Sequence, residues 1–121
     1  RDYLNLPSDM FVVTEKMYKT QKPLLRRFLA AYRESAAWMI AKPKEAAKIA
    51  ITRAINGRNE KINLDIIKIR NISSVSKTTA TKGLGRFDLD LLQKGAATFK
   101  ALGLIKNKID IAKVVKSDLI P

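Results

Sequence analysis

The sequence of 121 residues contains neither cysteine nor histidine. Disulfide bonds, thiolate nucleophiles and the common zinc sites are therefore excluded within it, and so is the side chain that most often acts as a general base. A serine–lysine pair or two carboxylates would still allow catalysis in principle. We expect no catalytic residue, no metal site and no cofactor in this chain.

Long hydrophobic runs are also absent, since no apolar run approaches the roughly 20 residues that a helix needs to span a bilayer. Apolar residues make up 46% of the sequence and charged residues 29%, which is typical of a globular protein. The chain begins with RDYLNLP, without an initiator methionine or a signal peptide. We therefore expect it to be a segment of a longer protein, whose targeting sequence would lie upstream.

Acidic residues are few, because 24 Lys and Arg stand against 11 Asp and Glu, for a net charge of +13. A charge of this size raises nucleic acid or an anionic surface as a partner. The basic residues are scattered singly along the chain, however, with Arg26 and Arg27 as the one adjacent pair. No regular aromatic interleaving indicates a base-stacking surface. We interpret the charge as a solvated basic surface and expect no nucleic acid partner.

Helical periodicity is clearest in KPLLRRFLAAYRESAAWMIAKP. Pro23 fits the first turn of a helix, and Pro43 predicts that this helix ends near Ala41 and that a second one begins. The second helix is predicted over residues 43–55, where Asn56 and Gly57 stop it. Residues at helical spacing form one apolar stripe on the first helix: Leu25, Phe28, Leu29, Tyr32, Ala36, Met39 and Ile40.

Residues 63–82 are less regular. Ile62, Leu64 and Ile66 alternate like a strand, but a broad helical face can be shared by Leu64, Ile67, Ile69 and Ile72. We therefore predict a helix there with Asn63 as its N-cap. The polar stretch SSVSKTTATK, residues 73–82, has no strong period and is predicted to be a loop.

The stretch KGLGRFDLDLLQ, residues 82–93, combines two glycines with basic residues before an expected helix. A dinucleotide-binding fingerprint would need a third glycine where Asp88 stands, and the Walker sequence does not occur. Asp88 fits an N-cap and Asp90 a favourable first-turn acid, so we interpret the stretch as a helix start. Gly103 is predicted to end that helix.

The last residues offer Asp110 as a further N-cap, followed by a short apolar turn through Ile111 and Val115. Residues 118–121 are expected to fold back onto the body of the protein.

A short apolar, β-branched run, MFVVT at residues 10–14, is predicted to be a buried strand, followed by a helical turn at residues 15–19. One strand is not stable alone and must pair within a sheet. No other convincing strand is visible in the sequence. We therefore predict an α/β protein whose further strands come from residues outside this chain.

The order of these elements resembles the C-terminal part of ABC-transporter substrate-binding proteins, in the group for nitrate, taurine, aliphatic sulfonates or the pyrimidine precursor of thiamine. The residues that carry the resemblance are Pro23 with Phe28, Pro43 with Ala46 and Ala47, Gly103 to Lys106, and Asp110 to Val115. The family often has tryptophan at about the position of Arg86. Because this chain has arginine there instead, an aromatic role at that position is not expected to carry over.

The resemblance implies one segment, residues 1–121, of a two-lobed type II periplasmic-binding-protein fold, mostly helical with one or two strands. Residues 1–9 would return from the hinge, and residues 10–121 would add a strand and helices to the first lobe. It further implies a ligand-binding role near the hinge for Tyr3, Ser8 and Asp9. An ordinary turn in LPSD remains the alternative for these residues.

The function implied is capture of a small anionic or heteroaromatic molecule and its delivery to a transporter permease, without covalent chemistry. The location would be periplasmic or the cell surface, with membrane contact through the transporter or through a lipid anchor outside this chain. Without its sheet partners, the segment is expected to expose apolar surface and to associate with itself. Two alternatives remain open: a basic helical nucleic-acid-binding module, and an enzyme of the same fold that makes the thiamine pyrimidine.

Overall fold

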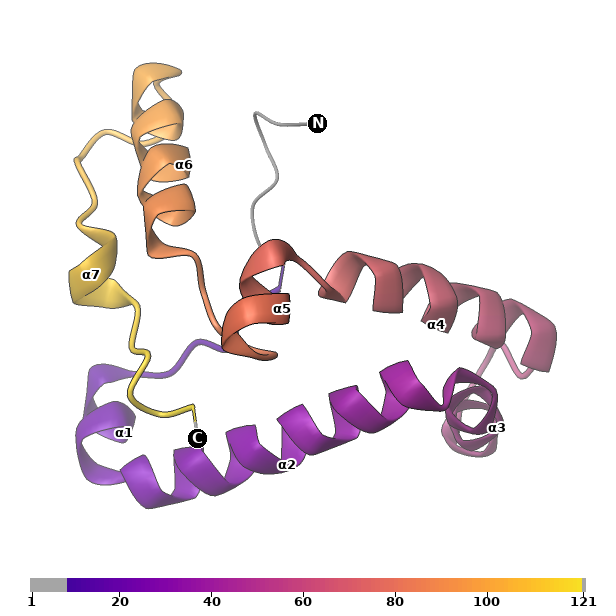
Figure 1. Ribbon diagram of the computed structural model, residues 1–121. Helices are drawn as coiled ribbons and strands as arrows, with labels where there is room; N and C mark the ends of the chain where they lie inside the picture. The colour runs from indigo at the N-terminus through magenta and orange to yellow at the C-terminus, as the bar shows by residue number, and fades with distance from the viewer. Residues whose placement is uncertain (1–8, 121) are drawn as a thin grey trace. The chain divides into compact units, whose positions relative to one another are not determined.

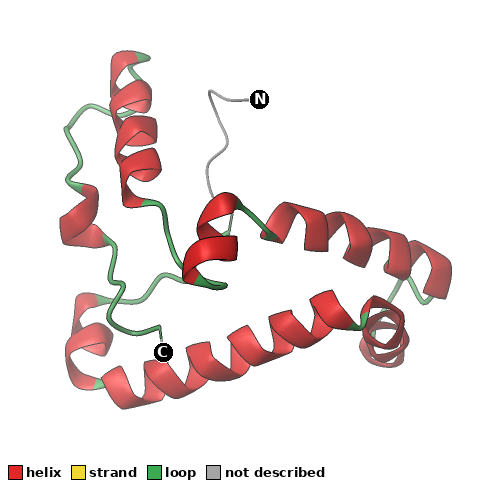
Figure 2. Ribbon diagram, viewed as in Figure 1, coloured by secondary structure: helices red, strands yellow, loops and turns green. Residues whose placement is uncertain are grey.

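The computed structural model describes residues 9–120, and their regular secondary structure is entirely helical (Figures 1 and 2). The helices, in chain order, are α1 (Glu15–Thr20), α2 (Lys22–Ala41), α3 (Pro43–Arg53), α4 (Glu60–Ser74), α5 (Lys77–Lys82), α6 (Leu89–Ala101) and α7 (Ile111–Val114).

The predicted strand at residues 10–14 is wrong, and so is the α/β fold class that depended on it. Within the described residues no strand is present, and Met10 to Val13 form an exposed, irregular segment. Thr14 instead acts as the N-cap of α1, where its side-chain oxygen accepts a hydrogen bond from the Met17 N–H at 3.1 Å. An apolar β-branched run forms a strand only when a neighbour completes the hydrogen-bond ladder, and the described residues supply none.

The two helices predicted around Pro43 are confirmed as α2 and α3. Pro43 lies in the first turn of α3, where its missing N–H has no intrahelical partner to lose. The predicted stripe of α2 is only partly covered, since Leu25 is buried while Phe28 and Tyr32 are about half exposed. Their rings stack on each other, with 6.4 Å between centroids.

Helix α4 is confirmed, but its N-cap is Asn59 and not Asn63. The Asn59 side chain accepts from the Ile62 N–H at 3.0 Å. Asn63 lies one turn inside the helix, and its side-chain amide donates to the carbonyl oxygens of Gly57 (2.6 Å) and Asn59 (2.8 Å). Asn63 thus ties the loop before α4 to the first turn of the helix.

The loop predicted for residues 73–82 contains helix α5. A reciprocal capping box starts this helix: the Thr79 N–H donates to Ser76 Oγ at 3.2 Å, and the Ser76 N–H donates to Thr79 Oγ1 at 2.6 Å. The usual capping box carries Glu or Gln at the second position. Thr79 takes that position here, and its hydroxyl oxygen accepts from the Ser76 N–H in the same way. Because threonine is not the usual residue at this position, the sequence pattern resembles a polar loop.

The KGLGRFD stretch is a structural start of α6, as predicted. The Asp88 carboxylate accepts from the Leu91 N–H at 2.9 Å. The turn before it places Gly83 and Gly85 at φ of 90° and 82°, which side chains rarely adopt. At the other end, Gly103 has φ of 73°, and the Leu104 N–H donates to Phe99 O at 2.9 Å. This is a Schellman ending.

The described residues form two compact units, one of residues up to 26 and from 86 onward, the other of residues 27–85. In the first unit, Leu25, Leu92 and Leu119 are buried. In the second, α3 packs against α4, with Ala47 fully buried and Ile67 nearly so. Asn71 on α4 also donates from Nδ2 to the Met39 carbonyl oxygen of α2 at 3.2 Å.

Candidate functional site

The predicted ligand-binding residues lie at the edge of the described structure or beyond it. Tyr3 and Ser8 fall outside the described residues. Asp9 is the first residue described and is exposed to solvent. The role of these three residues in ligand binding therefore stays a prediction.

A group of polar side chains in the first unit surrounds the C-terminal segment. We call it the tail clamp, and it consists of Tyr18, Lys22, Arg26 and Arg86 acting on residues 117–120. Tyr18 donates from its hydroxyl to Asp118 Oδ1 at 3.0 Å, and Lys22 donates to Asp118 Oδ2 at 2.8 Å. Arg26 donates from Nη2 to the Asp118 carbonyl oxygen at 3.1 Å. Asp118 is thus bonded through both its side chain and its backbone. These bonds hold the C-terminal segment against the first unit, in agreement with the predicted fold-back of residues 118–121.

Charge reinforces these contacts. The hydrogen bonds from Lys22 and Tyr18 hold the pKa of Asp118 below its usual value, and the bond to Asp118 raises the pKa of Lys22. The Lys22 ammonium also lies 4.4 Å from the centroid of the Tyr18 ring, and that of Lys116 lies 5.6 Å from it. Cations at such distances are attracted by the electron-rich ring face.

Arg86 bonds main-chain oxygens of the tail. Its guanidinium donates from Nη1 to the Ser117 carbonyl oxygen at 3.3 Å and from Nη2 to the Ile120 carbonyl oxygen at 3.2 Å. A planar guanidinium carries several N–H donors and can therefore bond two carbonyl oxygens at once. Arg86 is thus a tail-binding side chain.

The pH dependence of stability tests the tail clamp. Because the pKa of Asp118 is lowered in the folded protein, its contribution is present above the ordinary aspartate pKa and is lost as the pH falls through the folded value. We expect Asp118→Asn to lower the thermal midpoint at pH 7, and to make the midpoint fall less steeply as the pH drops below the ordinary aspartate pKa of about 4. Circular dichroism melts from pH 7 into the acid range measure both effects.

The matched control is Asp65→Asn, which changes an exposed aspartate on α4 in the other unit. If Asp118→Asn and Asp65→Asn gave the same acid dependence as the unchanged protein, the ion pair of Asp118 with Lys22 would have no part in stability.

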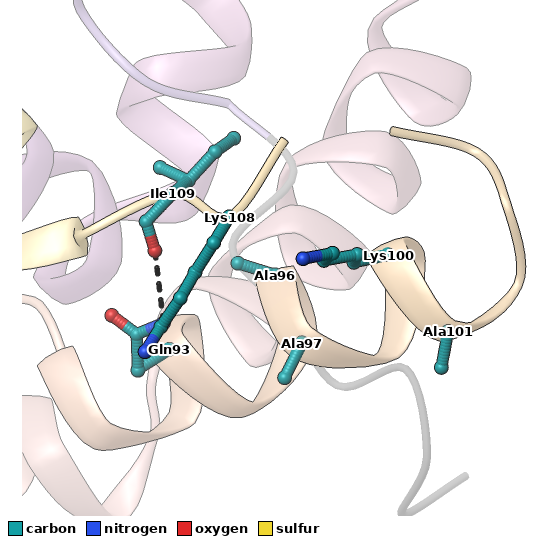
Figure 3. A pocket seen from close by; sticks show the side chains of 7 residues that line it. All are labelled: Gln93, Ala96, Ala97, Lys100, Ala101, Lys108 and Ile109. Atoms are coloured by element: carbon teal, nitrogen blue, oxygen red, sulfur yellow. Dashed lines mark hydrogen bonds between the residues drawn. The ribbon is translucent and has the colours of Figure 1, made fainter. Parts of the chain in front are cut away.

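An open groove of about 350 Å³ runs along α6 in the same unit (Figure 3). Its lining residues are Gln93, Ala96, Ala97, Lys100, Ala101, Lys108 and Ile109. The three alanines of α6 have short side chains, which leaves space beside the helix. Figure 3 shows the side chains of Lys100 and Lys108 extending along the groove.

Gln93 fixes one wall of this groove. Its Nε2 donates to the Ile109 carbonyl oxygen at 3.0 Å, and its Oε1 accepts from the Ile111 N–H at 3.1 Å. The amide therefore bonds the backbone on both sides of Asp110 and holds the start of α7 against α6. The charged groups that line this groove are the ammoniums of Lys100 and Lys108, which would attract an anion.

Sequence reasoning missed both places. No pattern marks Gln93 or Arg86, because each acts on backbone atoms of a segment distant in sequence. Tyr18 and Lys22 stand four apart in sequence but lie on different helices, α1 and α2, and their shared partner Asp118 lies about a hundred residues away.

Among the described residues, no group of three or more acidic side chains gathers in a way that could hold a metal ion. No helix in that part of the chain has both the length and the apolar character needed to cross a bilayer.

Comparison with known proteins gives one match. Residues 1–46 match the family described as NMT1/THI5 like. The matched segment includes Tyr3, Ser8 and Asp9, helices α1 and α2, and the first residues of α3. Neither the curated proteins nor the solved structures give a match to the chain. The family match supports the resemblance to substrate-binding proteins over this segment, and with it a binding or related function.

Proposed function

We propose that this protein is the extracytoplasmic solute-binding component of an ABC transporter. It captures a small anionic or heteroaromatic molecule and delivers it to the permease, and it carries out no covalent chemistry itself. The observation that carries the proposal is the NMT1/THI5-like match over residues 1–46. That segment holds all three residues predicted to contact ligand, Tyr3, Ser8 and Asp9.

The chemistry of the chain is consistent with binding rather than catalysis. Without cysteine or histidine, the chain lacks the commonest nucleophile–base pairs. A net charge of +13 attracts anions and raises their concentration near the surface. Tyr3 would stack on a flat ligand, while Ser8 and Asp9 would form hydrogen bonds to it.

For delivery, the permease must distinguish the protein with bound ligand from the protein without it, which requires a difference in conformation. A ligand shifts a conformational equilibrium only by the difference in its affinity for the two states. In this proposal the ligand binds one conformation more tightly, and the permease recognises that conformation. No nucleic acid takes part, and the protein meets the membrane through the transporter or through a lipid anchor.

The test is a thermal-shift screen of the full-length protein against nitrate, taurine, an alkanesulfonate and an aminopyrimidine. A ligand at a hundred times its dissociation constant adds about 2.7 kcal/mol to stability, which is readily detected as a higher midpoint. We expect one class to stabilise the protein, and Tyr3→Ala or Asp9→Asn to reduce its affinity. Asp65→Asn is the control that should leave the affinity unchanged.

Two results would contradict the proposal. One is the absence of any shift with all four compounds. The other is retention of an oligonucleotide at physiological salt with a steep salt dependence, which is the signature of phosphate contacts and would favour the nucleic-acid-binding alternative.

A further inference from the structure

The C-terminal segment places its own carboxylate between two donors of the first unit. The two side-chain oxygens of Asp118 are bonded separately, Oδ1 by the Tyr18 hydroxyl at 3.0 Å and Oδ2 by the Lys22 ammonium at 2.8 Å. The donors come from two helices, α1 and α2, which are separated by Gln21. Hydrogen bonds to a charged carboxylate are stronger than those between neutral groups. We call Tyr18 and Lys22 together the carboxylate site.

Positive charge beside this site exceeds what the tail supplies in return. Arg26 donates to the Asp118 carbonyl oxygen, and Lys116 lies over the same tyrosine ring, 5.6 Å from its centroid. Neither cation forms an ion pair within the described part of the chain. Glu15 also belongs to α1, but its carboxylate is paired with Lys19 at 2.7 Å. The surroundings of the carboxylate site therefore attract anions.

Solvent reaches the bonded pair, since the side chains of Lys22 and Asp118 are 37% and 43% exposed. Exposed ion pairs contribute little to stability, so a dissolved anion can compete with Asp118. The tail does not have to leave for this exchange. Burial of Leu119 and the bonds from Arg86 to main-chain oxygens hold the backbone, while the Asp118 side chain can turn to another staggered rotamer.

We propose that Tyr18 and Lys22 bind the carboxylate of a small dissolved molecule, and that Asp118 is a built-in competitor that occupies the site when this molecule is absent. A competitor lowers the apparent affinity of a site by the fraction of time for which the site is open. The tail thereby sets the ligand concentration at which the carboxylate site fills. Since the site contains none of the three residues predicted to contact ligand, the proposal goes beyond solute capture and is tested separately from it.

The probe is succinate, because a dicarboxylate suits a site with more than one cation beside it. Its control is the uncharged succinamide, and sodium chloride keeps the ionic strength constant so that screening is equal. Nuclear magnetic resonance follows the isotope-labelled rings of Tyr3, Tyr18 and Tyr32 in the full-length protein, with signals assigned through single Tyr→Phe variants. We expect succinate to shift the Tyr18 signal, and the titration gives its affinity.

Three variants separate the competitor from the site. Asp118→Ala removes the competitor and should tighten succinate binding by about tenfold. Lys22→Met, made in the Asp118→Ala background, keeps the length of the side chain without its charge and should weaken binding by about tenfold or more. The matched control in that background is Lys19→Met, which removes an exposed lysine of α1 and should leave the affinity nearly unchanged. If Asp118→Ala fails to fold, Asp118→Asn keeps the shape of the side chain without its charge and should also tighten binding.

Four results would overturn this assignment. Equal succinate affinity with and without the Asp118 carboxylate would show that the tail does not compete. A shift of the Tyr3 signal in place of Tyr18 would put succinate at the residues predicted for solute capture. Equal losses from Lys22→Met and Lys19→Met would reduce the binding to general attraction by the net positive charge. The same Tyr18 shift with succinamide would show that charge has no part.

Discussion

Replacing Leu119 with alanine is expected to lower the free energy of unfolding by about 2–5 kcal/mol, the range for deleting a buried leucine side chain. Leu119 is 6% exposed and is one of the few buried side chains of the first unit. Its neighbours Asp118 and Ile120 are bonded by Tyr18, Lys22 and Arg86, so the backbone is held in place and the vacated space cannot easily collapse. Urea unfolding followed by circular dichroism measures the loss.

The control is Leu104→Ala, which shortens a leucine that is largely exposed just after α6. Surface substitutions of this kind usually change stability by about 0.5 kcal/mol or less. If Leu119→Ala behaved like Leu104→Ala, the tail would not be packed on the first unit as described, and the tail clamp would contribute little to stability.

The second large effect is expected for Ala47→Leu, which should destabilise the protein by about 1–3 kcal/mol through overpacking. Ala47 is fully buried where α3 packs against α4. Three additional carbon atoms would force the two helices apart, and Ile67 on the facing helix would lose part of its burial. The thermal midpoint and the denaturant midpoint should both fall.

Ala37→Leu provides the matched control, because the same substitution is made at an exposed position within helix α2. Leucine is a good helix former, so Ala37→Leu should be close to neutral. Equal effects at the two positions would mean that the contact of α3 with α4 is loose enough to accept a larger side chain.

The positions of helices were the most predictable feature of this sequence, because capping and proline signals act locally. Pro43 separated α2 from α3, Asp88 started α6, and Gly103 ended it, each through bonds within a few residues. The wrong predictions here assigned a cap to a neighbouring asparagine or missed a capping box with an unusual second residue. Asn59 took the capping role assigned to Asn63, and Thr79 completed the capping box that starts α5.

The strand prediction at residues 10–14 was wrong for a different reason. The β-branched run gives a strand preference, but a strand depends on partners that local sequence does not contain. With no ladder available in the described residues, the helix-capping bond of Thr14 decides the local structure. The same limit applies to the tail clamp and the groove, since Arg86 and Gln93 act on backbone atoms of segments far along the chain.

The way Arg86 holds the C-terminal segment has a consequence for sequence variation. Because the guanidinium bonds the main-chain oxygens of Ser117 and Ile120, those two bonds would persist whatever side chains stood at either position. The two residues in between are held through their side chains. Asp118 forms an ion pair with Lys22, and the Leu119 side chain is buried. A saturation library over residues 117–120 should therefore be permissive at its two ends and restrictive at its centre.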